Sequence, residues 1–219
     1  MIEARLSAAA LAAGLQAPAL MLIRRIALRQ DAQAAFEDEI AALTEEYGPA
    51  PLTQLMAGSP FAAKAGAASR SWLPGGEGGD ATRLWRSNFE DACLIAALEA
   101  GLPALLHDAR DVLEDLAIDV TTDGKGAPAI GLFCGERLLS TLSAAGCSID
   151  PQGAIRPDTG YLLLFVPGNA RTNAAASRAV CLRAVRLLRR SCPQVYAQII
   201  LVHRPPGSNA VRLASVERG

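Results

Sequence analysis

Histidine and lysine are nearly missing from this chain of 219 residues, which holds two of each. Catalytic zinc sites commonly take two or three histidines from one chain, so a metal centre belonging wholly to this chain is not expected. Aromatic residues make up 5% of the sequence. The aromatic platforms that usually accompany arginine in single-strand nucleic-acid binding are therefore sparse. The chain also lacks the GxSxG, P-loop and strand–GxGxxG–helix signatures of catalytic and nucleotide sites.

Cysteine spacing and hydropathy indicate in which cellular compartment the protein is found. The five cysteines form an odd set without a CxxC pair, which argues against a disulfide framework and a structural zinc site. They predict free, buried thiols in a reducing environment. No apolar run is long enough to cross a bilayer, and Glu3 lies where a signal peptide would be basic. We expect a cytoplasmic protein with no membrane contact.

Apolar spacing predicts an α+β fold in which a helical N-terminal half packs on a small three-stranded α/β module. The expected division is a mainly helical domain over 1–120, with a long loop at 49–80, and an α/β domain over 121–219. Helices are expected over 2–14, over 18–28 (where a strand is the alternative), from Asp31 to Gly48, from Asp80 to Gly101, after Pro103 to about 118, over 136–145 and over 173–190. Strands are expected near 129–134, 161–166 and 195–202.

Charge is distributed unevenly along the sequence. Residues 1–158 carry 12 basic and 21 acidic side chains, whereas residues 159–219 carry 9 basic and 1 acidic. Attraction within the molecule is the favoured explanation, and two faces of opposite sign offered to partners is the alternative. The predicted helix 173–190 concentrates the positive charge on one arc: Arg178, Arg183, Arg186, Arg189 and Arg190. We expect this arc to face solvent or an acidic partner rather than nucleic acid.

Two sequence patterns could carry chemistry. His107, Asp108 and Asp111 could be a metal-ligand set, but an acidic, solvated helix face explains them better. Cys134 closes a predicted strand where a helix would begin, and a helix N-terminus lowers a thiol pKa. A nucleophilic role for Cys134 is therefore considered, although a buried structural cysteine is favoured.

The apolar strand over 129–134 is a candidate peptide-binding element. If it lies at a sheet edge, its free backbone groups could accept an extended peptide as an added strand. The alternative is a central, fully paired strand. The residues that would contact the peptide are Ala129, Ile130, Leu132, Phe133 and Cys134.

Residues 83–118 resemble a known family. Trp85-Arg86-Ser87-Asn88, Ala97-Leu98 and Leu102-Pro103 stand where that family has tyrosine-arginine-x-asparagine, an alanine-leucine pair and phenylalanine-proline. The pattern is similar to the helical domain of small partner proteins that accompany multinuclear iron oxidases in peptide natural-product pathways. The expected layout is most similar to the accessory subunit of methanobactin biosynthesis.

This resemblance implies a non-catalytic accessory subunit that forms a heterodimer with an iron-dependent oxidase. The subunit would bind the leader of a ribosomal precursor peptide while the peptide's cysteines become oxazolone and thioamide groups. It implies partner contacts through Trp85, Arg86, Asn88 and Phe89, no cofactor on this chain, and iron in the partner. Two other hypotheses remain: a stand-alone interaction protein, such as an immunity or regulatory partner, and an enzyme that uses Cys134.

Overall fold

The computed structural model describes residues 2–27, 35–36, 38–39, 41–42, 45, 87–143, 146–168 and 173–206. Within these ranges the chain is mostly β, with ten strands in two sheets. The strands are β1 (Ala4–Leu6), β2 (Ala19–Arg24), β3 (Leu105–Asp108), β4 (Leu116–Thr122), β5 (Pro128–Cys134), β6 (Arg137–Ser143), β7 (Gly146–Ile149), β8 (Tyr161–Val166), β9 (Tyr196–Ile200) and β10 (Val202–His203). The described helices are α1 (Ala8–Ala12), α4 (Asn88–Ala100), the short 3-10 turn η4 (Pro151–Gly153) and α5 (Ala174–Ser191).

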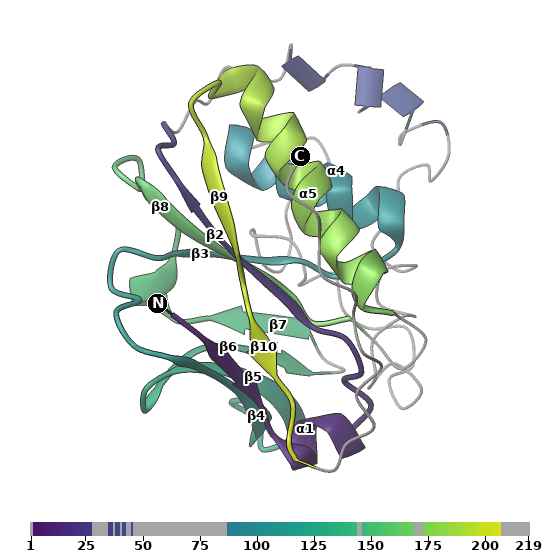
Figure 1. The fold of residues 1–219 in the computed structure, drawn as a ribbon, viewed down its shortest axis with the longest axis vertical. Helices are drawn as coiled ribbons and strands as arrows, with labels where there is room; N and C mark the ends of the chain where they lie inside the picture. The colour runs from purple at the N-terminus through teal and green to yellow at the C-terminus, as the bar shows by residue number, and fades with distance from the viewer. Residues whose placement is uncertain are drawn as a thin grey trace.

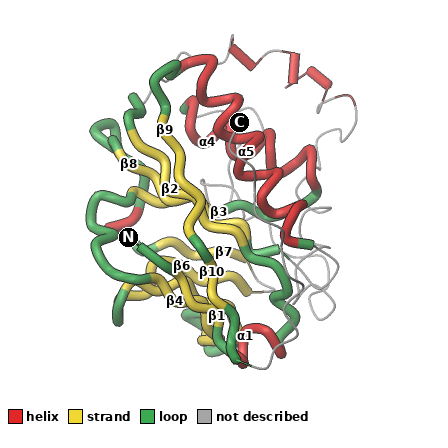
Figure 2. Tube along the Cα trace, in the orientation of Figure 1, coloured by secondary structure: helices red, strands yellow, loops and turns green. Residues whose placement is uncertain are grey.

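The structure has three layers. The four-stranded sheet, in the order β3-β8-β2-β9, lies between helices α4 and α5 on one face and the six-stranded sheet on the other (Figures 1 and 2). The six-stranded sheet has the order β10-β1-β4-β5-β6-β7. Strand β9 continues directly into β10, so one chain segment contributes an edge strand to each sheet.

The middle sheet is buried on both faces. In β8, alternate residues point to opposite sides: Leu162 and Leu164 pack against the helices, while Leu163 and Phe165 pack against the six-stranded sheet. All four side chains are at most 1% exposed. Strand β2 divides its residues between the two cores in the same way. The sheet therefore belongs to two hydrophobic cores at once.

The two long helices have clear capping residues. Ser87 caps α4: its hydroxyl accepts a hydrogen bond from the Glu90 backbone N–H and donates one to the Glu90 carboxylate. Gly101 ends α4 in the left-handed conformation. Asn173 caps α5 by accepting from the Ala176 backbone N–H. The helices pack on each other, and their apolar faces cover the middle sheet.

The predicted helical N-terminal half is wrong. Residues 2–14 contain strand β1 and the short helix α1, separated by the cap Ser7. The segment after Pro18 is β2, the alternative that the sequence left open. The helix expected after Pro103 is replaced by β3 and β4. Because β2 and β3 are covered on both sides, they show no alternation that would have distinguished a strand from a buried helix.

The predicted three-stranded α/β module is also wrong, because its three strands are divided between two sheets and the same part of the chain adds β6 and β7. The positions of the three predicted strands and of the long helix are confirmed. Strands β5 and β8 lie at 128–134 and 161–166, helix α5 covers the expected segment, and β9 and β10 occupy 196–203. The helix expected over 136–145 is instead β6, which forms a hairpin with β5 through Gly135 at φ 57°. Both sheets combine strands from either side of the expected boundary between residues 120 and 121. The helix expected from Asp31 is described at only a few positions, and the loop 49–80 lies outside the described residues.

Gly101 offers a direct test of the α4 terminus. Its φ of 61° is strained for an L side chain, yet an added Cβ would meet nothing within 4 Å. Replacing Gly101 with Ala should therefore lower the free energy of unfolding by about 1–2 kcal/mol, through backbone strain alone. Gly160→Ala is the matched control, because that site is also open and has no positive φ. Urea unfolding should show a loss for the first variant and little change or a small gain for the second; equal losses would contradict the assignment.

Candidate functional site

The predicted peptide-binding strand is not an edge strand. Strand β5 pairs with β4 over seven residue positions on one side and with β6 on the other. Its backbone groups are therefore engaged in the sheet, and the premise for strand addition at Ala129–Cys134 is wrong. Ala129, Ile130 and Leu132 are buried, and the last two belong to the core between the sheets. The side chain of Phe133 lies on the outer face, close to Gly131.

The predicted partner-binding residues divide into two pairs. Trp85 and Arg86 lie outside the described residues. Asn88 and Phe89 are both 0% exposed. The Asn88 amide donates to the Ala27 carbonyl at 3.1 Å and to the Ser191 hydroxyl at 3.0 Å, while Phe89 fills the core under the helices. These two side chains join the start of α4 to the end of α5 rather than pointing outward.

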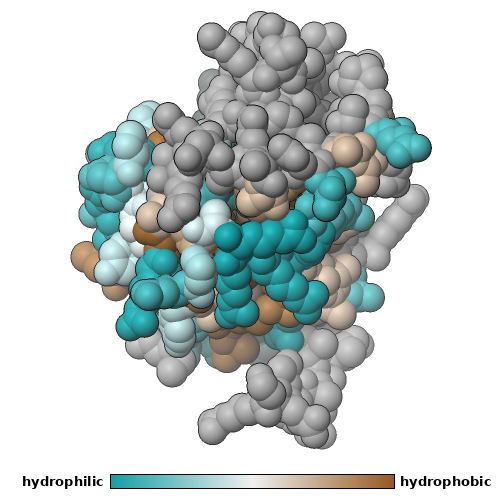
Figure 3. Space-filling view, turned by 90° about the horizontal axis from the view of Figure 1, so that it is seen from above, coloured by the Kyte–Doolittle hydropathy of each residue, from teal (hydrophilic) through white to brown (hydrophobic). Residues whose placement is uncertain are grey.

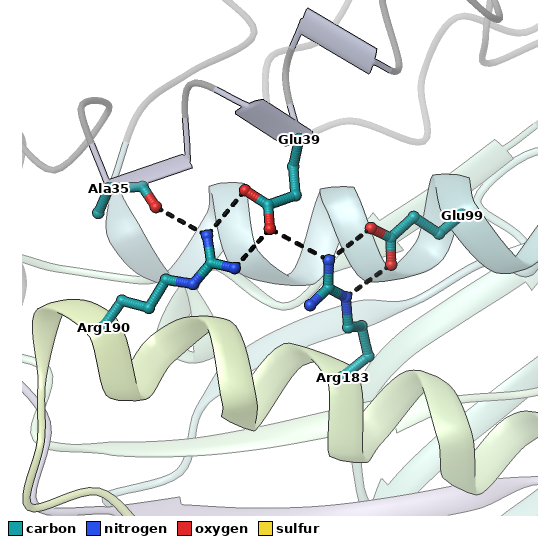
Figure 4. A network of polar contacts seen from close by, with 5 residues as sticks. All are labelled: Ala35, Glu39, Glu99, Arg183 and Arg190. Carbon is teal, nitrogen blue, oxygen red and sulfur yellow. Dashed lines mark hydrogen bonds and ion pairs between the residues drawn. The ribbon is translucent and has the colours of Figure 1, made fainter.

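Part of the arginine arc on α5 is used within the molecule (Figure 4). Arg190 donates to both Glu39 carboxylate oxygens, at 2.8 and 2.6 Å, and to the Ala35 carbonyl. Arg183 forms two 2.7 Å hydrogen bonds to Glu99 of α4 and a 3.2 Å bond to Glu39. The two guanidinium groups lower the pKa of Glu39, chiefly through the Arg190 hydrogen bonds. This network supports the expected attraction between the acidic and basic parts of the chain.

The rest of the arc faces outward. Arg186 and Arg189 are exposed and Arg178 is half-buried. Seen from above, the described surface shows a gathering of strongly hydrophilic side chains beside patches of hydrophobic ones (Figure 3). Solvent exposure, one of the two expectations for this arc, is therefore confirmed for Arg186 and Arg189.

His107 lies in the core between the two sheets. It is 0% exposed, and its Nε2 lies 3.4 Å from the hydroxyl of Ser140 on β6. Its Nδ1 is buried without a hydrogen-bond partner. Burial lowers the pKa of His107 to about 4, opposed in part by the nearby Asp150 carboxylate. The Ser–His contact resembles a nucleophile and its base, but Ser140 is only 3% exposed, so a substrate has no access to it.

The proposed ligand set around His107 is not assembled. Successive strand residues point to opposite faces, so Asp108 turns away from His107. There it accepts a 2.6 Å hydrogen bond from Thr159 and pairs with Arg110 at 3.2 Å. The predicted solvated helix face is also wrong, because these residues belong to β3 and the turn after it. Among the described residues, no group of three His, Cys, Asp or Glu side chains could hold a metal ion.

Cys134 does not occupy a helix N-terminus. It ends β5 and is followed by the turn into β6, so no helix dipole acts on its thiol. The side chain is buried, and the nearest hydrogen-bond acceptor, the Glu114 carbonyl, lies 3.9 Å away. The expected burial of Cys134 is confirmed.

Strand β9 is an edge strand of the middle sheet with exposed apolar side chains. Strand β9 pairs with β2 over five residues, and no described strand lies on its other side. Tyr196 is 53% exposed, Ile199 39%, and Leu201, just beyond the strand, 55%. By contrast, all four residues of β3, at the opposite edge of the same sheet, are buried.

This edge also lacks the usual protection. Soluble proteins commonly guard edge strands with charged side chains, proline or a bulge. No charged residue occurs between Cys192 and Val202, and the β2–β9 register runs without a shift. The prediction of a strand at 195–202 did not reveal this property, because the sequence does not show which strands are terminal. The free edge of β9 is the candidate functional site.

The Glu39 network predicts a measurable contribution to stability. The folded state depresses the pKa of Glu39 below its ordinary 4.5, so the stabilisation is present at neutral pH and disappears as the pH falls below that value. Glu39→Gln should lower the free energy of unfolding by about 1–3 kcal/mol at pH 7, and the difference from the native protein should shrink in acid. The control is Glu99→Gln, which removes a more exposed partner of Arg183 alone and should cost less than about 1 kcal/mol. Urea titrations at pH 7 and pH 3 measure both; equal effects would refute the central role of Glu39.

His107 predicts a second pH dependence. Unfolding lets the imidazole take up a proton near its ordinary pKa of 6.5, whereas the folded protein resists this until about pH 4. Stability should therefore fall between pH 6.5 and 4, by at most about 1.4 kcal/mol per pH unit. His107→Leu should flatten this slope, while His203→Gln, a change at a half-exposed histidine, should preserve it. An unchanged slope in the His107 variant would show that another group is responsible.

Comparison with known proteins leaves the family open. No protein-family model matches the sequence, and no curated protein matches it. Among the described helices, none is long and apolar enough to span a membrane. The resemblance over residues 83–118 stays a prediction, and Leu102-Pro103 leads here into a strand rather than into the second helix of a hairpin.

Proposed function

We propose that this protein binds an extended peptide segment as an additional strand alongside β9. The proposal rests on the free edge of β9. This strand pairs regularly with β2 over five residues, has half-exposed Tyr196 and Ile199, and has no described partner on its outer side. In strand addition, backbone hydrogen bonds supply affinity and alternate side chains supply specificity. Such a site needs no catalytic residue.

The surroundings of β9 make it a firm platform. Its inner neighbour β2 is buried at five of its six positions. Ile200 of β9 is buried in the core between the sheets. The backbone N–H of Ala4 donates to the Leu201 carbonyl at 3.0 Å, which fixes the exit of β9 to the other sheet. The edge is thus held in place before a peptide arrives, which reduces the ordering cost of binding.

Within this proposal, the peptide is the leader of a ribosomal precursor and the protein is the accessory subunit of an iron-dependent oxidase in the cytoplasm. The support is the sequence pattern over 83–118, which resembles partner proteins of such oxidases. Iron and the oxidation of cysteines to oxazolone and thioamide groups then belong to the partner. Trp85 and Arg86 remain the proposed partner contacts, and Asn88 and Phe89 anchor the start of α4.

Proline substitution tests the edge. Backbone N–H groups of successive strand residues point alternately to the two sides, so one of Gln198 and Ile199 donates toward β2 and the other outward. Gln198→Pro and Ile199→Pro should therefore differ. The substitution that removes a bond to β2 destabilises the fold, whereas the other leaves stability nearly unchanged and weakens peptide binding at least tenfold. The probe is the most enriched fluorescent peptide from a random twelve-residue phage-displayed library.

Threonine at the same two positions is the matched control, because it alters the side chain but keeps the backbone donor. Both threonine variants should retain binding within a few-fold. Full binding by the folded proline variant would contradict strand addition. A concentration-dependent dimer that disappears in that same variant would assign the edge to a second copy of this chain instead.

The accessory role is tested separately. Co-expression with an iron oxidase and a Cys-containing precursor encoded beside this protein should yield a stable heterodimer in size-exclusion chromatography. Deleting the precursor's leader should remove the peptide from the complex and leave the two proteins together. Recovery of only the free chain would refute the oxidase partnership without bearing on the peptide edge.

A further inference from the structure

We propose that Arg24, set between Tyr161 and Tyr196, selects a carboxylate on the peptide bound at β9. This inference rests on the proposed function and adds the chemical class of the peptide. The three residues come from three adjacent strands at one end of the middle sheet. None of them belongs to the sites considered above, except that Tyr196 begins the β9 edge.

The strand register places these side chains in one row. Arg24 of β2 pairs with Tyr161 of β8 and with Tyr196 of β9. Residues directly opposite each other in a sheet point to the same face, with their Cβ atoms about 5 Å apart. The register therefore places Arg24 between two tyrosines on one face of the sheet.

The exposure of the row suits binding rather than packing. Tyr161 is 49% exposed and Tyr196 53%, and both are among the most exposed large side chains described. Arg24 is half-buried, and its Nε is fully buried without a hydrogen-bond partner. Burying a guanidinium donor without a partner is unfavourable. A ligand oxygen could not reach the buried Nε, but the terminal nitrogens of Arg24 are not among the buried unpartnered atoms. A negative charge bound at those nitrogens would lower the cost of holding the guanidinium group in a half-buried position.

Charge around the row favours a negative ligand. Among the residues that the structure describes, no carboxylate forms an ion pair with Arg24, although Arg110, Arg183 and Arg190 all have acidic partners. Arg25 adds a second positive charge next to it and is exposed. Asp158, three positions before Tyr161, is already paired with Arg110 at 3.1 Å, and no acidic residue occurs between Gly160 and Val216. A carboxylate is the side-chain group that forms planar, paired hydrogen bonds with arginine.

The distance from the edge is also suitable. Strands in a sheet lie about 4.8 Å apart, so a peptide residue paired with Tyr196 would have its Cα about 10 Å from that of Arg24. Its side chain would point to the same face as the row. Extended Arg and Glu side chains together span this separation. The structure thus points to an acidic residue in the part of the peptide that passes Tyr196.

Selection from the random twelve-residue library tests this inference. The native protein should enrich peptides with alternating apolar residues and an Asp or Glu at one fixed position. Arg24→Gln should lose the acidic preference and keep the apolar alternation. The control Arg186→Gln removes an exposed arginine on α5 and should retain both features. Thermal unfolding of the Arg24 variant confirms that its fold is intact.

Synthetic peptides then measure the pairing. Replacing the enriched Glu with Gln should weaken binding to the native protein about tenfold, as expected for a charge-assisted hydrogen bond, and should have no effect on Arg24→Gln. Comparing free-acid and amidated C-termini shows whether the carboxylate is a side chain or the chain terminus. Retention of the acidic preference by Arg24→Gln would overturn the inference while leaving strand addition standing. Failure of every variant to enrich extended peptides would overturn both.

Discussion

The rest of the structure depends on the burial of the middle sheet on both of its faces. Strands β2 and β8 contribute alternate side chains to the helix-covered core and to the core between the sheets. Each strand therefore removes apolar surface from water on both of its faces. This burial is the main source of stability, because the hydrophobic effect is the dominant favourable term in folding. Without the middle sheet, the apolar faces of α4 and α5 would be exposed to water. The same holds for the inner face of the six-stranded sheet.

Electrostatic contacts add to this arrangement at the outer surface. Helix α5 packs its apolar face on the middle sheet and directs Arg183 and Arg190 toward carboxylates from two other segments. Glu39 is only 11% exposed, and partly buried charge-assisted hydrogen bonds are stronger than exposed ones. The excess of positive charge near the C-terminus thus serves the fold in part. Arg24, Arg186 and Arg189 have no described acidic partner and remain available for other contacts.

The candidate site arises where the middle layer ends. Strand β9 has β2 on one side, and the described structure places no strand on the other. Its inner positions are held by the cores, whereas Tyr196 and Ile199 remain in contact with solvent. A regular strand with exposed apolar side chains, next to an arginine without a described acidic partner, supports the proposed binding of an extended peptide. The buried Ser140–His107 pair and the buried Cys134 offer no accessible nucleophile by comparison.

Local sequence determined the elements whose signals are self-contained: the apolar run of β8, the strand β5, and helix α5 with its Asn173 cap and a 3.6-residue apolar period. Where one segment was consistent with either a helix or a strand, as at Leu20 and Leu105, only tertiary structure decided, because burial on both faces removes the periodicity that distinguishes them. The position of β5 inside a sheet follows from its pairing with β4 and β6, two segments that the sequence pattern assigns to helices in part or in full. The position of β9 at an edge depends on pairing with β2, between residues more than 100 positions apart. Arg24, Tyr161 and Tyr196 form a row for the same reason: register across strands, not spacing along the chain, brings them together.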